Sequence, residues 1–220
     1  MRGKPMDYLF TKNQTEVIPM KKILDGSTHF KDGERELGPT IGDFWAWAMS
    51  RLMADGPRGD LAEFIVNAAL GSDMTIPKKG WGECDILYRG KRVEVKCSSV
   101  LQEWVRETPS RPVFSIAKTL ACDCIEQGDG SYIYRKRPDD DFPQRRSEVY
   151  VFCLFSEPDR RWADPSDFSQ WQFYIVPTAV LNERLGDQRQ ISLQGLERIG
   201  AVKCSYSGLK ASVDKVLMLE

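Results

Sequence analysis

The chain has 220 residues, of which 41% are hydrophobic and 29% charged, enough for one sizeable core or at most two small ones. A formal charge of −1 and a pI of about 6.0 exclude a basic field over the whole molecule, so any contact with nucleic acid must come from local patches. The longest strongly apolar run, Val149 to Phe155, is too short to cross a bilayer. We therefore expect a cytoplasmic protein with no membrane partner and with reduced thiols.

The first half of the chain predicts an arm and two helices. Residues 1–38 are polar and punctuated by glycines, which predicts an irregular N-terminal arm ahead of a domain over residues 39–220. The segment "DFWAWAMSRLMA" at 43–54 predicts an amphipathic helix, with Trp45 and Trp47 in the core rather than stacked on bases. After a break at "ADGPRG", "DLAEFIVNAAL" at 60–70 predicts a central helix that ends at Gly71.

The second half predicts a short sheet and further helices. "SSVLQEWVRE" at 98–107 predicts a short helix capped by Ser98 or Ser99, with Trp104 in the core. One of the three tryptophans Trp45, Trp47 and Trp104, if exposed, could instead stack on a base. Strands are expected in "PVFSIA", "VYVFCLF" and "WQFYIVP", the second buried on both faces, and three helices follow Pro177. The predicted fold class is α/β (α+β), with a mixed central sheet flanked by helices.

A long charged loop is expected near residues 128–148. Its basic residues are Arg135, Lys136, Arg137, Arg145 and Arg146. They belong either to a solvated loop or to a flexible arm that touches phosphates. The cysteines lack metal-ligand spacing, because Cys122-Asp123-Cys124 has no two-residue spacer, and His29 is the only histidine. We expect the thiols to pack as small hydrophobic groups and assign His29 no role.

The segment "ECDILYRGKRVEVKCSS" at 83–99 predicts a β-hairpin with an unusual charge pattern. A turn at Arg89-Gly90 would pair Asp85 with Glu94, and Glu83 with Lys96, on one face. Two carboxylates opposed at about 5 Å repel unless one is protonated or a cation lies between them. Oxygen ligands without histidine suit Mg²⁺, with Mn²⁺ as a substitute. Lys96 could orient or help deprotonate a metal-bound water and stabilise charge on phosphorus.

Asp85, an eight-residue gap and Glu94-Val95-Lys96 resemble the PD-(D/E)xK nuclease superfamily, which includes restriction endonucleases, junction resolvases and repair nucleases. Cys84 replaces the proline of that motif. The similarity to bacterial proteins described as restriction-endonuclease-like extends over residues 41–209. It implies a restriction-endonuclease-like core.

The resemblance also implies the roles of single residues. Asp85, Glu94 and Val95 would hold the metal, with Glu63 completing the site directly or through water. Lys96 would assist the attacking water, and Gln102 would fill a polar position on the following helix. Two readings from the residues stay open. Glu63 could instead belong to a solvent-facing stripe with Asp60 and Asn67, and Gln102 could be a surface amide.

The function implied is a Mg²⁺-dependent DNA endonuclease of restriction or defence type. Because one such site cuts one strand, duplex cleavage requires a homodimer or two successive nicks. Two alternatives stay open. One is a nucleic-acid-binding module that keeps the fold without catalysis. The other is a nuclease that acts only with an accessory protein.

Overall fold

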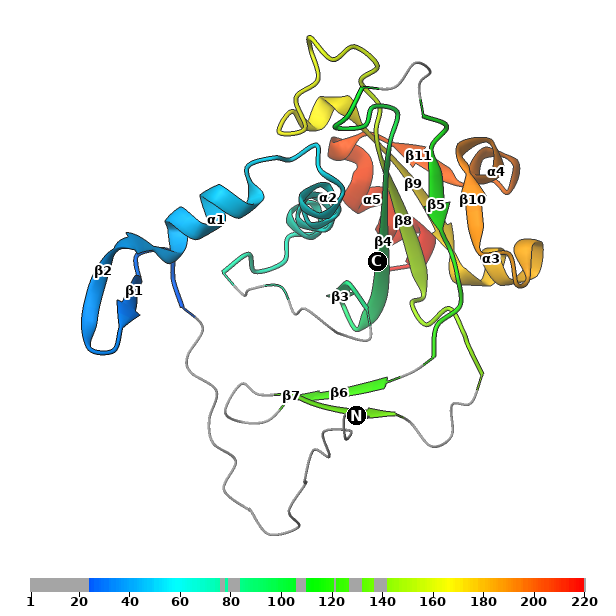
Figure 1. The fold of residues 1–220 in the computed structure, drawn as a ribbon. Helices are drawn as coiled ribbons and strands as arrows, with labels where there is room; N and C mark the ends of the chain where they lie inside the picture. The colour runs from blue at the N-terminus through cyan, green and yellow to red at the C-terminus, as the bar shows by residue number, and fades with distance from the viewer. Residues whose placement is uncertain are drawn as a thin grey trace, which may run out of the picture.

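A computed structural model of the chain describes residues 24–75, 78, 84–105, 110–120, 122–126, 132–136 and 142–219. Of residues 122–126 and 132–136 it describes the backbone alone. The structure is a mixed α/β fold with a five-stranded central sheet in the order β11-β9-β8-β4-β3 (Figure 1). In this sheet β4 and β8 are parallel, and the other neighbours are antiparallel. The prediction of an α/β fold with a mixed central sheet flanked by helices is therefore confirmed.

The helices and strands follow one another with short connections through much of the chain. The strands are β1 His29–Asp32, β2 Arg35–Thr40, β3 Ile86–Tyr88, β4 Lys91–Ser99, β5 Val113–Ser115, β6 Cys122–Glu126, β7 Tyr132–Lys136, β8 Val149–Phe155, β9 Trp171–Pro177, β10 Gln190–Ser192 and β11 Val202–Cys204. The helices are α1 Ile41–Met49, α2 Asp55–Leu70, α3 Thr178–Leu185, α4 Leu193–Arg198 and α5 Tyr206–Leu217, with one 3-10 turn, η1, at Phe168–Gln170. None of the described helices combines the length and the apolar character that a bilayer crossing requires.

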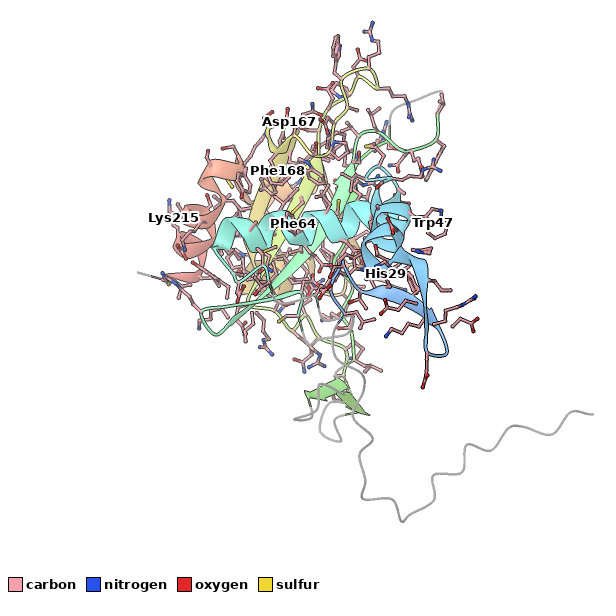
Figure 2. All side chains as sticks on the ribbon, turned by 90° about the vertical axis from the view of Figure 1, so that its left-hand side faces the viewer. His29, Trp47, Phe64, Asp167, Phe168 and Lys215 are labelled. Atoms are coloured by element: carbon pink, nitrogen blue, oxygen red, sulfur yellow. The ribbon has the colours of Figure 1, made fainter. Side chains whose placement is uncertain are left out.

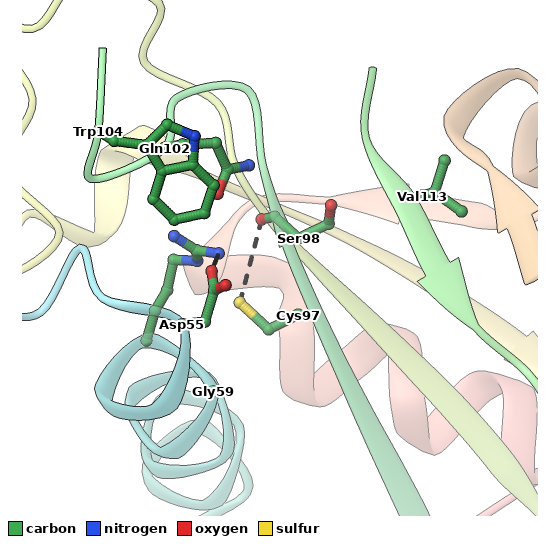
Figure 3. A pocket seen from close by; sticks show the side chains of 8 residues that line it. Asp55, Gly59, Cys97, Ser98, Gln102, Trp104 and Val113 are labelled. Carbon is green, nitrogen blue, oxygen red and sulfur yellow. Dashed lines mark hydrogen bonds and ion pairs between the residues drawn. The ribbon is translucent and has the colours of Figure 1, made fainter. Parts of the chain in front are cut away.

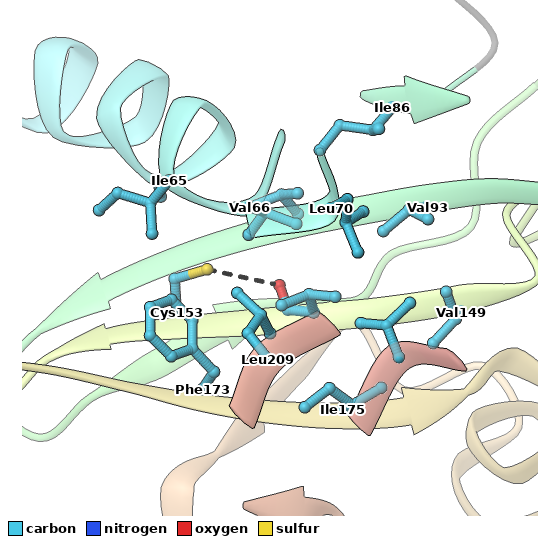
Figure 4. Close-up of a cluster of buried hydrophobic side chains, with 14 of the residues drawn as sticks. Ile65, Val66, Leu70, Ile86, Val93, Val149, Cys153, Phe173, Ile175 and Leu209 are labelled. Atoms are coloured by element: carbon cyan, nitrogen blue, oxygen red, sulfur yellow. Dashed lines mark hydrogen bonds between the residues drawn. The ribbon is translucent and has the colours of Figure 1, made fainter. Parts of the chain in front are cut away.

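The sheet separates two hydrophobic cores. On one face α2 and α5 pack against alternate residues of β4, β8 and β9, such as Val93, Val151 and Ile175 (Figure 4). On the other face β5, β10, α3 and α4 cover the remaining residues of β8 and β9, among them Phe152 and Tyr174. Every residue of β8 is buried, as predicted for a strand with both faces covered.

The N-terminal segment differs from the predicted irregular arm. β1 and β2 form an antiparallel hairpin, and the predicted boundary after residue 38 falls inside β2. Thr40 and Asp43 form a capping box that starts α1. Figure 2 shows this segment, with His29 and Trp47, at the periphery of the molecule.

The prediction that Trp45 and Trp47 belong to the core is wrong. No residue of α1 is buried, and 82% of Trp47 is exposed. An amphipathic sequence specifies which face of a helix is apolar, whereas a partner for that face depends on the rest of the fold.

α2 begins earlier than predicted and ends where predicted. Pro57 lies in its first turn, where a missing N–H leaves no helical hydrogen bond unmade, so "DGPRG" belongs to the helix. Gly71 ends the helix with a left-handed φ of 76°, which glycine adopts without strain.

The predicted helix after β4 is wrong. Ser98 and Ser99 continue β4, where Ser99 pairs with Phe155, and residues 100–105 form bends. The Arg160 guanidinium, from a distant loop, donates to the backbone carbonyls of Gln102, Glu103 and Trp104. These carbonyls are therefore held in a non-helical arrangement, and Trp104 is more than half exposed rather than in the core.

The charged segment near 128–148 is a loop only in part. Its β7 strand pairs with β6, and the side chains of Arg135 and Lys136 lie outside the described residues, as does all of Arg137. Arg145 is buried and does not belong to a flexible arm. Of the described cysteines, Cys153 is fully buried and Cys84, Cys97 and Cys204 are half-buried.

Candidate active site

The hairpin of β3 and β4 has the predicted register. Ile86 pairs with Val93 and Leu87 with Arg92. The turn residues Arg89 and Gly90 have φ values of 47° and 73°, the left-handed conformations that a tight two-residue turn needs. Regular pairing stops at Ile86, so Asp85, the next residue outward, stands beside Glu94 at the point where β3 leaves β4. Glu83 lies outside the described residues.

Beyond Val93, no described strand pairs with the outer side of β4. Arg92 accepts a backbone hydrogen bond from Glu148, and Val100 donates one to Phe155, so even-numbered residues turn their backbone groups toward β8. Because backbone groups alternate along a strand, the N–H and C=O of Val95 point to the outer edge. Asp85 occupies this edge, with its Oδ2 accepting from the Val95 N–H at 2.7 Å.

The Asp85 carboxyl is surrounded by charged groups. Although the residue as a whole is exposed, its carboxyl lies against the edge of β4, and this burial is the largest cause that raises its pKa to about 6. The negative charge of Glu94 raises the pKa further, and Glu63 on α2 adds a smaller effect. The Val95 N–H and Lys96 act in the opposite direction. Two further carboxylates, one on β4 and one on α2, therefore act on the Asp85 carboxyl.

Glu94 and Lys96 lie on the face of β4 that carries the second core. Lys96 Nζ lies 2.5 Å from Glu94 Oε1, and the Ser147 hydroxyl donates to Glu94 Oε2 at 3.1 Å. Tyr150, the register partner of Glu94 on β8, is buried. Burial, followed by the charge of Glu94, raises the pKa of the Tyr150 hydroxyl, which stays protonated at neutral pH.

Glu63 lies at the wall of a pocket of about 200 Å³ that it shares with Asp85 and Asn67. It is not free, because Lys78 Nζ lies 2.8 Å from Glu63 Oε1 and 2.6 Å from Asp60 Oδ1. Glu63 is largely buried, whereas Asp60 is more exposed. The predicted solvent-facing stripe therefore borders a pocket occupied in part by an ammonium group.

Gln102 does not join the acidic group. It lies in the bends after β4 and lines a separate pocket with Asp55, Arg58 and Trp104 (Figure 3). Its amide reaches only the Ser99 carbonyl, at 3.5 Å. The predicted role for Gln102 depended on a helix that does not form.

Sequence reasoning missed Lys78, Ser147 and Tyr150. Ser147 and Tyr150 come beside Glu94 only through the parallel pairing of β4 with β8, which joins segments more than fifty residues apart. The signal that could have found Tyr150 is its hydroxyl within the otherwise apolar strand "VYVFCLF". Lys78 offered no signal, because it belongs to no regular element.

The donor set is compatible with a small divalent cation. Within the described ranges no three His, Cys, Asp or Glu side chains are grouped closely enough to hold an ion. Mg²⁺ commonly takes one or two carboxylates and completes its shell with water, carbonyl or phosphate oxygens. Asp85, Glu94 and the Val95 carbonyl would supply such oxygens, and the charge of Glu94 is, after burial, the second cause that raises the pKa of Asp85.

Comparison of the sequence with protein-family models gives no match, and comparison with curated proteins gives none either.

Proposed function

We propose that this protein is a metal-dependent nuclease with a restriction-endonuclease-like core of the PD-(D/E)xK type, acting on DNA. The observation that supports the proposal most is the position of Asp85 beside Glu94 at the open edge of β4, with Lys96 paired to Glu94 on the same strand. Two carboxylates that can hold a divalent cation, with an ammonium group beside them, are suited to phosphodiester hydrolysis.

Each residue would have a separate task. Asp85 and Glu94, with the Val95 carbonyl, would hold Mg²⁺, which supplies positive charge against the charge that develops on the phosphate. The Ser147 hydroxyl would fix the orientation of Glu94 through its 3.1 Å hydrogen bond. Lys96 would donate to the attacking water or to a phosphate oxygen and so orient the reacting groups. Glu63, on α2 in the pocket that it shares with Asp85, would act directly or through water.

The reaction would be hydrolysis. A water oxygen forms a bond to phosphorus, the bond from phosphorus to one ester oxygen breaks, and that oxygen takes a proton and leaves as a hydroxyl. The products are a strand with a terminal phosphate monoester and a strand with a free hydroxyl. Duplex cleavage by this arrangement would need a second copy of the chain or two successive nicks. A role in defence against foreign DNA belongs to the same proposal.

Nicking of supercoiled plasmid tests the proposal. We expect cleavage with Mg²⁺ or Mn²⁺ and none with EDTA. Lys96→Ala and Glu94→Gln should each lower the cleavage rate at least about 100-fold, in the range measured for groups that transfer protons or stabilise charge. Lys91→Ala, at the turn end of the same strand, is the matched control and should cleave at the parental rate. Circular dichroism checks that the variants fold. If either site variant cleaved as fast as the parent, the assigned roles would be wrong.

One observation favours a second candidate, a nucleic-acid-binding module without catalysis. Lys96 and Lys78 already neutralise Glu94 and Glu63, and no third acidic ligand joins the pair among the residues that the structure covers. Binding of DNA without cleavage under every metal tested would support this candidate. Cleavage that starts only when a partner protein is added would identify a nuclease that needs an accessory subunit.

A further inference from the structure

A second pocket lies on the same strand as the candidate active site. It has a volume of about 530 Å³ and lies between the first turn of α2 and the far end of β4 (Figure 3). Its lining includes Asp55, Arg58, Cys97, Ser98, Gln102 and Trp104. Ser98 is two residues beyond Lys96 on β4, which corresponds to about 7 Å along the strand. The pocket is therefore within reach of a strand whose phosphate lies at Lys96.

The charges that line this pocket cancel. Asp55 Oδ1 accepts from Arg58 Nη2 at 2.5 Å, and Arg58 Nη1 donates to the Met53 carbonyl at 2.7 Å. Arg58 is only 6% exposed, so its guanidinium is held in place. Burial raises the pKa of the Cys97 thiol to about 11, which keeps it neutral. A phosphate would have to compete with Asp55 for the guanidinium, so the described walls favour a neutral polar ligand.

The walls offer a flat apolar surface and an edge of hydrogen-bonding groups. The indole of Trp104 is 55% exposed and stands at the pocket beside Gln102 (Figure 3). The Gln102 amide and the Ser98 hydroxyl supply donors and acceptors. Cys97, like Val95, turns its backbone N–H and C=O toward the outer edge of β4, where no described strand pairs with it. A nucleobase has this combination of a π-face and a polar edge.

The backbone that carries the indole is held by polar contacts before any ligand binds. Arg160 donates to the Glu103 carbonyl at 3.1 Å and to the carbonyls of Gln102 and Trp104. Arg51 forms an ion pair with the Glu103 side chain. Because this backbone is already held and tryptophan has only two side-chain torsions, Trp104 loses little conformational freedom on binding, which favours its use as a stacking surface.

We infer that this pocket binds one unpaired nucleobase of the substrate strand, next to the linkage at Lys96. The inference rests on the proposed function for the position of that linkage, and it specifies the substrate class. A base inside a duplex is stacked and has its pairing edge occupied, so the substrate is single-stranded, or has a frayed end or a displaced base.

Binding of a fluorescent eight-nucleotide DNA, followed by anisotropy in EDTA, tests the pocket without cleavage. Trp104→Leu should weaken binding about tenfold or more, as found for loss of an aromatic group stacked on a base, and Trp104→Phe should restore most of it. Trp162→Leu, which changes a still more exposed tryptophan in another loop, is the control and should bind like the parent. Because Trp104 is exposed, these substitutions should leave the melting temperature unchanged.

Oligonucleotides with one abasic position, scanned along the strand, identify the contact. At one position the loss of the base should weaken binding by the parent about tenfold but leave binding by Trp104→Leu unchanged, because both changes remove the same contact. Equal losses for Trp104→Leu and Trp162→Leu, or additive losses at every position, would overturn the inference. Free nucleoside monophosphate is tested as a competitor. If it displaces the strand from the parent but not from Trp104→Leu, the pocket is a mononucleotide site and the assignment to a substrate strand is wrong.

The outcome is separable from that of the nuclease proposal. Binding that depends on Trp104, without cleavage under any metal, would support the base pocket and contradict the nuclease proposal. If Trp104→Leu cleaved plasmid at the parental rate and bound single-stranded DNA with the parental affinity, only the inference about the base pocket would be wrong.

Discussion

The carboxyl of Asp85 lowers the stability of the folded protein at neutral pH. Its folded pKa of about 6 lies above the ordinary 3.8, because burial and the charge of Glu94 disfavour the ionised form. The contribution of this carboxyl to folding is therefore favourable only at low pH, and it is lost as the pH rises from about 3.8 through about 6. Above that range the Asp85 carboxylate is ionised in both states, and its free energy is lower in the unfolded chain than in the folded protein.

Asp85→Asn should stabilise the metal-free protein at pH 7.5. The amide oxygen can still accept from Val95, and the repulsion with Glu94 disappears. Since the residue is partly exposed, water screens the interaction, and we expect a gain of about 1 kcal/mol. Thermal unfolding at several pH values measures it, and the gain should vanish below about pH 3.5. Asp32→Asn, on the exposed hairpin, is the control. A loss of stability at pH 7.5 would contradict the repulsion argument.

Lys78 is the second residue that affects the acidic group. Its ammonium lies within 2.8 Å of both Asp60 and Glu63, where a divalent cation would otherwise meet Glu63. Lys78→Met should therefore increase the affinity for Mn²⁺ several-fold, because it removes a competing positive charge. Titration calorimetry measures the affinity, and Lys118→Met, which breaks the distant pair with Asp187, is the control. Unchanged or weaker Mn²⁺ binding by Lys78→Met would show that Lys78 does not compete.

At the scale of elements, Arg145 joins the segments that cover the second core. Its guanidinium donates to Ile116 O at 2.8 Å, Asn182 Oδ1 at 2.8 Å, Gly186 O at 2.9 Å and Gln188 O at 2.9 Å. These acceptors come from the segment after β5, from α3 and from the turn before β10. A buried arginine that holds carbonyls of three segments fixes connections that have few regular hydrogen bonds of their own.

Arg145→Met should lower the free energy of unfolding by about 3 kcal/mol, because it leaves buried carbonyls without donors. Urea denaturation measures the change. Arg184→Met, on the exposed side of α3, should change stability by less than about 0.5 kcal/mol. Equal effects of the two substitutions would show that the bonds of Arg145 contribute nothing to stability.

The elements also show what the sequence can predict. The register of the β3–β4 hairpin followed from alternation and from Arg89-Gly90, which are local, and it placed Asp85 beside Glu94. The bends at residues 100–105 could not be predicted, because their carbonyls bind Arg160, more than fifty residues away, and the local sequence does not reveal that contact. The charge of Arg145 predicted solvent exposure, yet its hydrogen-bond partners are carbonyls of distant segments. Predictions failed where a long-range contact decided the local structure.

At the scale of the whole molecule, β8 couples the two cores. Val151 packs under α2 and α5, while its neighbour Phe152 packs against β5 and the second core. Neither core can lose its packing without exposing β8 to water. The hairpin of β1 and β2 with α1 has no such coupling, since no described residue of these elements is buried.

Hydrogen exchange followed by mass spectrometry should therefore divide the molecule into two parts. Amides of β8 and β9 should exchange only through global unfolding, and Val151→Ala and Phe152→Ala should speed exchange throughout both cores, because a loss on either side destabilises one cooperative unit. Amides of β1, β2 and α1 should exchange faster in the parent and should not respond to these substitutions. If Phe152→Ala sped exchange only in α3, α4 and β10, the two cores would unfold independently. In that case the strand that joins them would not couple the helix bearing Glu63 to the far side of the sheet.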